Sequence, residues 1–95
     1  MKTEKIRSYV GFAIKAGKVK IGIDNILSAK KNPFVVLYDE KLSDNSKRKL
    51  LSGCEKTVVY SAPMSEIMPG KNCLAIGVCE KNLATAIIKE MEENS

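Results

Sequence analysis

The sequence contains no histidine and no tryptophan, and only three cysteines. Without histidine, a catalytic proton transfer would need a carboxylate, lysine, tyrosine or thiol, and no spacing in the chain nominates one. Cys54, Cys73 and Cys79 form no CxxC pair, which argues against a structural zinc site or a disulfide framework. We therefore expect no enzyme, no metal and no cofactor, with the cysteines acting as small buried hydrophobes in a reducing cytoplasm.

Long apolar runs are also missing. The first ten residues, MKTEKIRSYV, lack the apolar core of a signal peptide, and no run approaches the length of a membrane-spanning helix. These absences predict a cytoplasmic protein that makes no membrane contact. With 95 residues, of which 44% are hydrophobic, the chain has enough apolar side chains for one modest core. We therefore expect residues 1–95 to form a single domain.

Charge is unevenly distributed along the chain. Residues 1–49 hold 12 Lys/Arg and 5 Asp/Glu, a balance of +7, whereas residues 50–95 hold 4 and 6, a balance of −2. This asymmetry favours a polyanion-binding face, although lysines are common on any protein surface. The basic run Lys47–Lys49 is expected to be a solvated helix face.

The positive charge is concentrated in GFAIKAGKVKIGIDNILSAKKN, residues 11–32, around a junction between two predicted helices. The lysines of this stretch are Lys15, Lys18, Lys20, Lys30 and Lys31. Asp24 is the one acid among them. A basic loop that leads into a helix N-terminus combines lysines with unpaired N–H groups and the positive end of the helix dipole. The junction therefore predicts a phosphate-facing surface.

Apolar spacing predicts most of the secondary structure. Helices are expected from Glu4 to a stop at Gly17, from Asp24 or Asn25 to about Asn32, from Ser43 to Gly53 and from Lys81 to Glu93. Strands are expected at Phe34–Tyr38, Thr57–Tyr60 and Cys73–Cys79, and Lys18–Ile21 is either a connector or a strand. Residues 61–72 predict a loop with one helical turn. This alternation predicts an α/β fold, a three-layer α/β/α sandwich with a small mixed sheet of about four strands.

Some residues carry more specific expectations. Thr3 and Ser43 are expected to cap the first and third helices. Gly11 is expected to allow another backbone to approach the first helix closely. Leu51 is expected to face the core, and Asp39 is expected to end its strand at the surface.

The second helix carries short polar side chains that are suited to reading RNA. Asp24, Asn25 and Ser28 are one turn apart on it. Asn25 can donate and accept at a base edge, Asp24 can accept from a guanine, and Ser28 is a weaker partner of either kind. Distorted RNA displays base edges to such side chains, while lysines contact its phosphates. The alternative is that Asp24 and Asn25 only cap the helix and that Ser28 is solvated.

Two strings, SYVGFAIKAGKVKIGIDNILSAKK and FVVLYDEKLSDNSKRKL, resemble the kink-turn-binding ribosomal protein superfamily of L-seven-Ae and L-thirty-e type, especially its short bacterial ribosome-associated members. The resemblance covers nearly the whole chain. It includes AGK followed by a glycine at a helix start, an apolar strand that ends in an acidic residue, and a Pro/Gly loop before the last strand. It implies an α/β/α sandwich that binds RNA and has no catalytic activity.

In that family, an NExxK motif after the glycine reads the sheared G·A pairs of the kink. On this chain the motif falls on Asp24, Asn25 and Ser28, after Gly22, and none of the three is identical. The position of the family lysine is occupied by Ser28, so other cations must contribute phosphate contacts. The lysines available for this are Lys18, Lys20, Lys30 and Lys31.

The family's loop before the last strand holds an extruded base. On this chain the loop falls on residues 64–68 and 71–73, where the resemblance implies that Met64 or Ile67 packs on the splayed base. Lys71 and Asn72 belong to the same loop.

These observations predict a ribosome-associated protein that recognises a kinked or bulged structured RNA, is monomeric when free and has no small-molecule substrate. The residues predicted to contact RNA are Lys18, Lys20, Gly22, Asp24, Asn25, Ser28, Lys30, Lys31, Met64, Ile67, Lys71 and Asn72. The alternative is a protein–protein interaction module of the same fold that has lost kink-turn readout.

Overall fold

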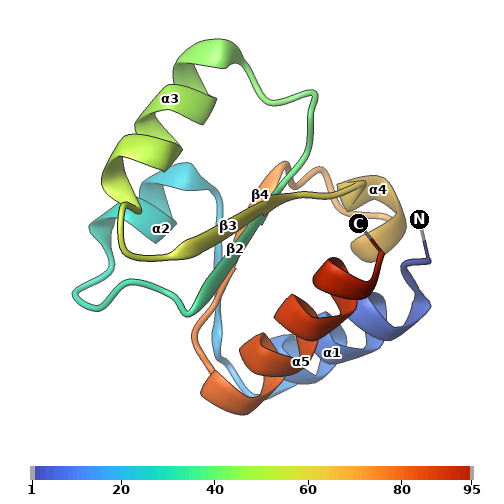
Figure 1. The fold of residues 1–95 in the computed structure, drawn as a ribbon. Helices are drawn as coiled ribbons and strands as arrows, with labels where there is room; N and C mark the ends of the chain where they lie inside the picture. The colour runs from blue at the N-terminus through green and yellow to red at the C-terminus, as the bar shows by residue number, and fades with distance from the viewer. Residues whose placement is uncertain (1, 95) are drawn as a thin grey trace.

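A four-stranded mixed sheet forms the centre of the computed structural model, which describes residues 2–94 (Figure 1). Its strands are β1 (Val19–Ile21), β2 (Val35–Tyr38), β3 (Val58–Ser61) and β4 (Ala75–Val78), in the order β1-β4-β2-β3. β2 and β3 are parallel, whereas β4 runs antiparallel to both of its neighbours. The segment Lys18–Ile21, which the sequence predicted to be either a connector or a strand, therefore contains the edge strand β1.

Helices cover both faces of this sheet. Three helices lie on one face, α1 (Glu4–Lys15), α4 (Met64–Ile67) and α5 (Lys81–Glu93), and two lie on the other, α2 (Ile23–Ser28) and α3 (Asp44–Gly53) (Figure 1). The prediction of a three-layer α/β/α sandwich with a small mixed sheet is confirmed. Within residues 2–94, no helix combines the length and the apolar composition needed to cross a membrane.

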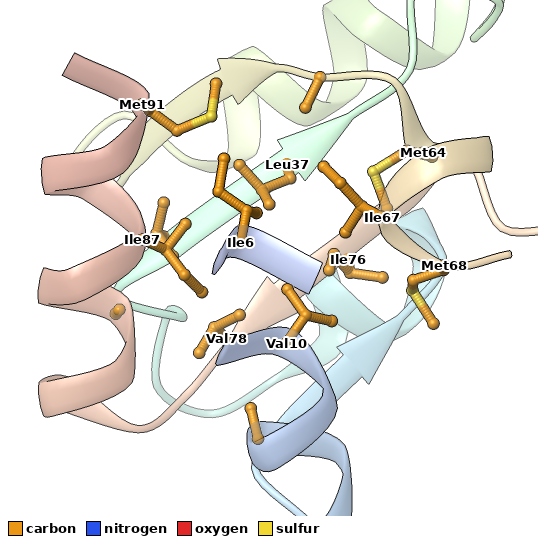
Figure 2. Packing of buried hydrophobic residues seen from close by; sticks show 14 of the residues in the cluster. Ile6, Val10, Leu37, Met64, Ile67, Met68, Ile76, Val78, Ile87 and Met91 are labelled. Atoms are coloured by element: carbon orange, nitrogen blue, oxygen red, sulfur yellow. The ribbon is translucent and has the colours of Figure 1, made fainter. Parts of the chain in front are cut away.

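Alternating side chains of β2 enter two separate cores. Val35 and Leu37 face α1 and α5, whereas Val36 faces α2 and α3, and all three are fully buried. Burial of each such side chain contributes about 1.5–3 kcal/mol relative to exposure. Figure 2 shows the larger core, in which Leu37 lies among side chains of α1, α4, α5 and β4. Those labelled are Ile6, Val10, Met64, Ile67, Met68, Ile76, Val78, Ile87 and Met91.

The end of α1 follows the sequence prediction. Gly17 has φ 70°, a conformation that glycine adopts without steric cost. The Gly17 N–H donates to the Ile14 carbonyl at 3.0 Å, and the Lys18 N–H donates to the Ala13 carbonyl at 2.9 Å. This pair of bonds is the Schellman arrangement, which satisfies carbonyls that the helix end would leave unpaired.

The helix caps were only partly predictable. Ser43 caps α3 as expected, because its Oγ accepts from the Ser46 N–H at 3.2 Å. Thr3 precedes α1, but its side chain makes no capping bond. The expectation for Thr3 is wrong because its backbone is already helical (φ −109°, ψ −4°), whereas a capping residue needs extended dihedrals. Glu80 is an additional cap, since its carboxylate accepts from the Leu83 N–H at 2.6 Å at the start of α5.

Two expectations about packing on the helices are wrong. A Cβ added at Gly11 would meet no atom within 4 Å, so no backbone approaches α1 there. Leu51 is 51% exposed, because the inward position of α3 is taken by Leu50 and the next residue is turned about 100° away.

The second helix is shorter than predicted. It ends at Ser28, and Ala29 is extended (φ −65°, ψ 135°), so Lys30 and Lys31 lie in the loop before β2. The cause lies in Pro33, whose ring packs on Gly77 in the middle of β4. A Cβ added at Gly77 would come within 2.5 Å of the Pro33 Cγ. The chain leaves the helix early because it must extend to bring Pro33 onto the sheet.

The expectation that Asp39 lies at the surface is wrong. Asp39 is buried, with 8% of its surface exposed. Its Oδ1 accepts from the Lys41 N–H at 2.9 Å, and its Oδ2 accepts from the Met64 N–H, the first residue of α4, at 3.0 Å. One carboxylate therefore joins the end of β2 to the start of α4. The hydrogen bond from Lys41 lowers the pKa of Asp39, the Met64 bond and the charges of Lys41 and Lys47 act in the same direction, and burial opposes them.

Replacement of Gly77 and of Gly11 by alanine should have opposite effects on the stability of the protein. We expect Gly77→Ala to lower the free energy of unfolding by about 1–3 kcal/mol, because its methyl group overlaps Pro33. Gly11→Ala should raise it by about 0.5–1 kcal/mol, because the helix interior there has room for a methyl group. Urea unfolding measures both, and a stabilised Gly77→Ala variant would contradict the packing described.

Asp39→Asn should lower the free energy of unfolding at neutral pH by about 1–3 kcal/mol, because the amide cannot accept both backbone bonds as the carboxylate does. A lowered folded-state pKa contributes stability above the unfolded-state pKa, and this contribution is lost as the pH falls through the folded-state pKa. The difference in free energy of unfolding between wild type and Asp39→Asn should therefore be smaller at acidic pH than at neutral pH. Urea unfolding at neutral and at acidic pH measures this difference. Glu40→Gln, at the exposed neighbouring residue, is the control and should change stability by less than about 0.5 kcal/mol.

Candidate functional site

A solvent-open hollow of about 530 Å³ lies along β1 and α2, and we call it the α2 hollow. It is lined by Val19, Lys20, Ile21, Asn25, Ser28, Ala29 and Lys30. β1 ends the strand order, so its outer edge has no strand partner within residues 2–94. Lys18 is exposed at the start of β1, where its carbonyl accepts from the Cys79 N–H at 2.7 Å. The hollow therefore opens on a free sheet edge that carries lysines.

Gly22 turns the chain directly from β1 into α2. Its φ of 89° and ψ of 152° are strained for any residue with a side chain. Its N–H donates to the Ala75 carbonyl of β4 at 2.9 Å, and its carbonyl accepts from the Ile26 N–H at 3.1 Å. Gly22 therefore fixes the position of α2 against the sheet, and its role here is conformational.

Asn25 is held against the end of β1. Its Nδ2 donates to the Ile21 carbonyl at 2.7 Å, and the Ser28 Oγ donates to the Asn25 carbonyl at 3.4 Å. The helix start has no side-chain cap, so the alternative that Asp24 or Asn25 caps α2 is wrong. The Asn25 amide has a second N–H and an oxygen in addition to this bond. These groups have the chemistry needed to pair with a base edge.

Asp24 is exposed but does not line the α2 hollow. Asn25 and Ser28 are three residues apart on α2, and both line the hollow. Asp24 is turned about 100° from Asn25, although it is only four residues before Ser28. The structure thus brings together Lys20, Asn25, Ser28 and Lys30, and leaves Asp24 outside this group. Because α2 has only six residues, its dipole is small, so the positive charge of the hollow comes from Lys20 and Lys30.

The loop before β4 differs from the expectation. Met64 and Ile67 are 1% and 2% exposed, and Figure 2 shows both side chains in the core beside α1. The expectation that either of them packs on a splayed base is therefore wrong. Lys71 and Asn72 are exposed in the same loop, as a contact with RNA requires.

Two other apolar side chains are exposed near Gly22. Leu74 is 40% exposed directly before Ala75, whose carbonyl binds Gly22, and Ile21 is 41% exposed directly before Gly22. The sequence did not identify Leu74 because it is the second residue of the apolar run CLAIGVC, all of which was expected to form a strand.

A second hollow of about 500 Å³ adjoins the first, and we call it the Phe34 hollow. It is lined by Lys20, Ala29, Lys30, Lys31, Asn32, Phe34 and Cys79, so three residues belong to both hollows. Phe34 had been expected to be part of the inner strand, but it precedes β2 and is 49% exposed. Cys79 is half-buried, which corrects the expectation that all cysteines are buried.

The described residues also bear on other chemistry. Burial raises the pKa of the Cys54 thiol, which makes it a weak nucleophile at neutral pH. Across residues 2–94, no group of three Cys, Asp or Glu side chains is placed to hold a metal ion. The cationic surface around the two hollows is thus the feature to be explained.

No protein-family model and no curated protein matches the sequence. The fold is similar to the solved structure of a protein with unknown function from Bacillus halodurans C, with a TM-score of 0.81. The alignment covers 90% of this chain and 95% of that chain, at 17% sequence identity. At this identity, the similarity shows a shared fold only.

Proposed function

We propose that this protein binds a kinked or bulged structured RNA at the α2 hollow and acts as a ribosome-associated protein without catalytic activity. The observation that carries the proposal is the grouping of Lys20 and Lys30 with Asn25 and Ser28 in one open hollow. It places cations that attract phosphates beside an amide that can pair with a base edge. The resemblance of the chain to the kink-turn-binding superfamily supports the same function.

Each group has a separate role in this proposal. Lys18, Lys20 and Lys30 contact phosphates and provide salt-dependent affinity. Asn25 reads a base edge in the widened groove of the kink, and its bond to Ile21 orients it in advance. Lys71 and Asn72 contact the RNA from the α4–β4 loop.

An extruded base needs an apolar surface, which Met64 and Ile67 do not provide. Leu74 and Ile21 are the exposed apolar residues beside Gly22, and we assign the base contact to them. The protein is proposed to be cytoplasmic and monomeric when free, with no membrane contact and no small-molecule substrate.

A protein-interaction module is the second candidate, and the free edge of β1 favours it. A strand of another protein can add to such an edge through backbone hydrogen bonds. Lys20 on this short strand opposes that mode, since edge lysines hinder strand addition. The RNA-binding measurements described next distinguish the RNA-binding protein from the protein-interaction module.

Kink-turn RNA should bind at least about tenfold more tightly than a plain duplex of equal length, and Asn25→Ala should abolish this preference. Fluorescence anisotropy with labelled RNAs at two salt concentrations measures both affinities. Asn45→Ala, at an exposed asparagine of α3, is the matched control and should leave the preference intact. Equal, strongly salt-dependent binding of both RNAs would contradict kink recognition.

Lys18→Glu combined with Lys20→Glu should weaken RNA binding at least about a hundredfold at low salt, because each charge reversal replaces phosphate attraction with repulsion. Arg7→Glu combined with Lys89→Glu makes the same change of net charge on exposed residues of α1 and α5. We expect this control to retain most of its affinity. Equal losses in both variants would mean that net charge alone accounts for binding, and no RNA binding by the wild type would favour the protein-interaction module.

A further inference from the structure

The Phe34 hollow combines an aromatic ring with positive charge. Phe34 lies directly before β2 and is 49% exposed, whereas its neighbour Val35, the first residue of β2, is fully buried. Lys20, Lys30 and Lys31 line the same hollow. Among the described residues that line it, none is Asp or Glu.

The backbone of Phe34 is anchored to the sheet. The Phe34 N–H donates to the Val78 carbonyl of β4 at 2.9 Å, and the preceding Pro33 packs on Gly77. The ring is therefore attached to the centre of the sheet although part of it faces solvent. Because the backbone is fixed, only the two side-chain torsions of Phe34 lose freedom when a flat ligand stacks on the ring.

The charges around the ring indicate what the ligand is. Bases stack on aromatic side chains whatever their sequence, and lysines beside the ring attract the phosphates on either side. An apolar protein surface that covered this hollow would have to desolvate the ammonium groups of Lys20, Lys30 and Lys31, which opposes its binding. The volume of about 500 Å³ lies within the range of roughly 300–1,000 Å³ that small ligands occupy.

We propose that Phe34 stacks on one unpaired base of the bound RNA, while Lys20, Lys30 and Lys31 contact the neighbouring phosphates. This inference rests on the proposed function, because the Phe34 hollow shares Lys20, Ala29 and Lys30 with the α2 hollow. A strand that leaves the RNA helix at Asn25 reaches Phe34 along this shared wall. The RNA recognised thus includes a single-stranded segment next to the kink.

The absence of tryptophan from the sequence allows a direct test. Phe34→Trp creates a single fluorescent indole in the hollow, and Phe12→Trp creates one on α1, where Phe12 is 56% exposed and lines neither hollow. The probe is a single-stranded oligoadenylate of about eight nucleotides, a length within the usual range of single-strand sites. Inorganic polyphosphate, which has phosphates but no bases, is the second probe.

Oligoadenylate should quench Phe34→Trp fluorescence strongly and Phe12→Trp fluorescence little, and polyphosphate should quench neither. Phe34→Ala should bind oligoadenylate about five- to a hundredfold more weakly, and Phe34→Tyr should restore most of the affinity. Thermal unfolding of each variant verifies that it is folded.

Equal quenching of the two tryptophan variants by bound oligoadenylate would overturn the stacking role while leaving the proposed function intact. Unchanged oligoadenylate affinity in Phe34→Ala would also overturn the stacking role. The exposed ring would then be assigned to contact with a protein partner. Quenching of Phe34→Trp together with no kink-turn binding by the wild type would support stacking and refute the proposed function.

Discussion

Burial of the central strand pair on both faces is the constraint on which the rest of the structure depends. Val35, Val36 and Leu37 are fully buried, and alternate residues of β2 face opposite layers. Helices must therefore cover both sides of the sheet, and only its edges and the ends of its strands remain for binding. Both hollows include Lys20 of the edge strand β1, and the Phe34 hollow also reaches the residue before β2.

Features that depend on local sequence were predictable. The apolar run before Tyr38, the Gly17 stop and the Ser43 cap each act through residues that are close in the chain. Two of the features that were missed depend on long-range contacts. The early end of α2 follows from Pro33 packing on Gly77, and the burial of Asp39 follows from a bond to Met64, 25 residues away. No local pattern contains this information.

The candidate site divides in the same way. Asn25 and Ser28 were placed correctly on one helix face because their spacing of three residues determines it. Asp24 shares a face with Ser28, four residues on, yet it does not line the hollow, and residue spacing alone does not contain this distinction. Met64 and Ile67 were misassigned because an apolar side chain can pack in a core as well as against a base. The family motif gives the position of a residue in the chain but not the direction of its side chain. Phe34 was missed for the converse reason, since an apolar run does not reveal which of its ends is exposed.

The pairing of β1 has a consequence for the order in which the protein is assembled during synthesis. β1 joins the sheet only through β4, with Val19 opposite Val78, so it has no strand partner until the last strand has been made. The turn at Gly22 depends on β4 as well, through the bond to the Ala75 carbonyl. A nascent chain that ends before β4 therefore carries the lysines and Asn25 without the geometry that groups them. The RNA-binding arrangement that we propose is thus acquired late, after most of the chain has left the ribosome.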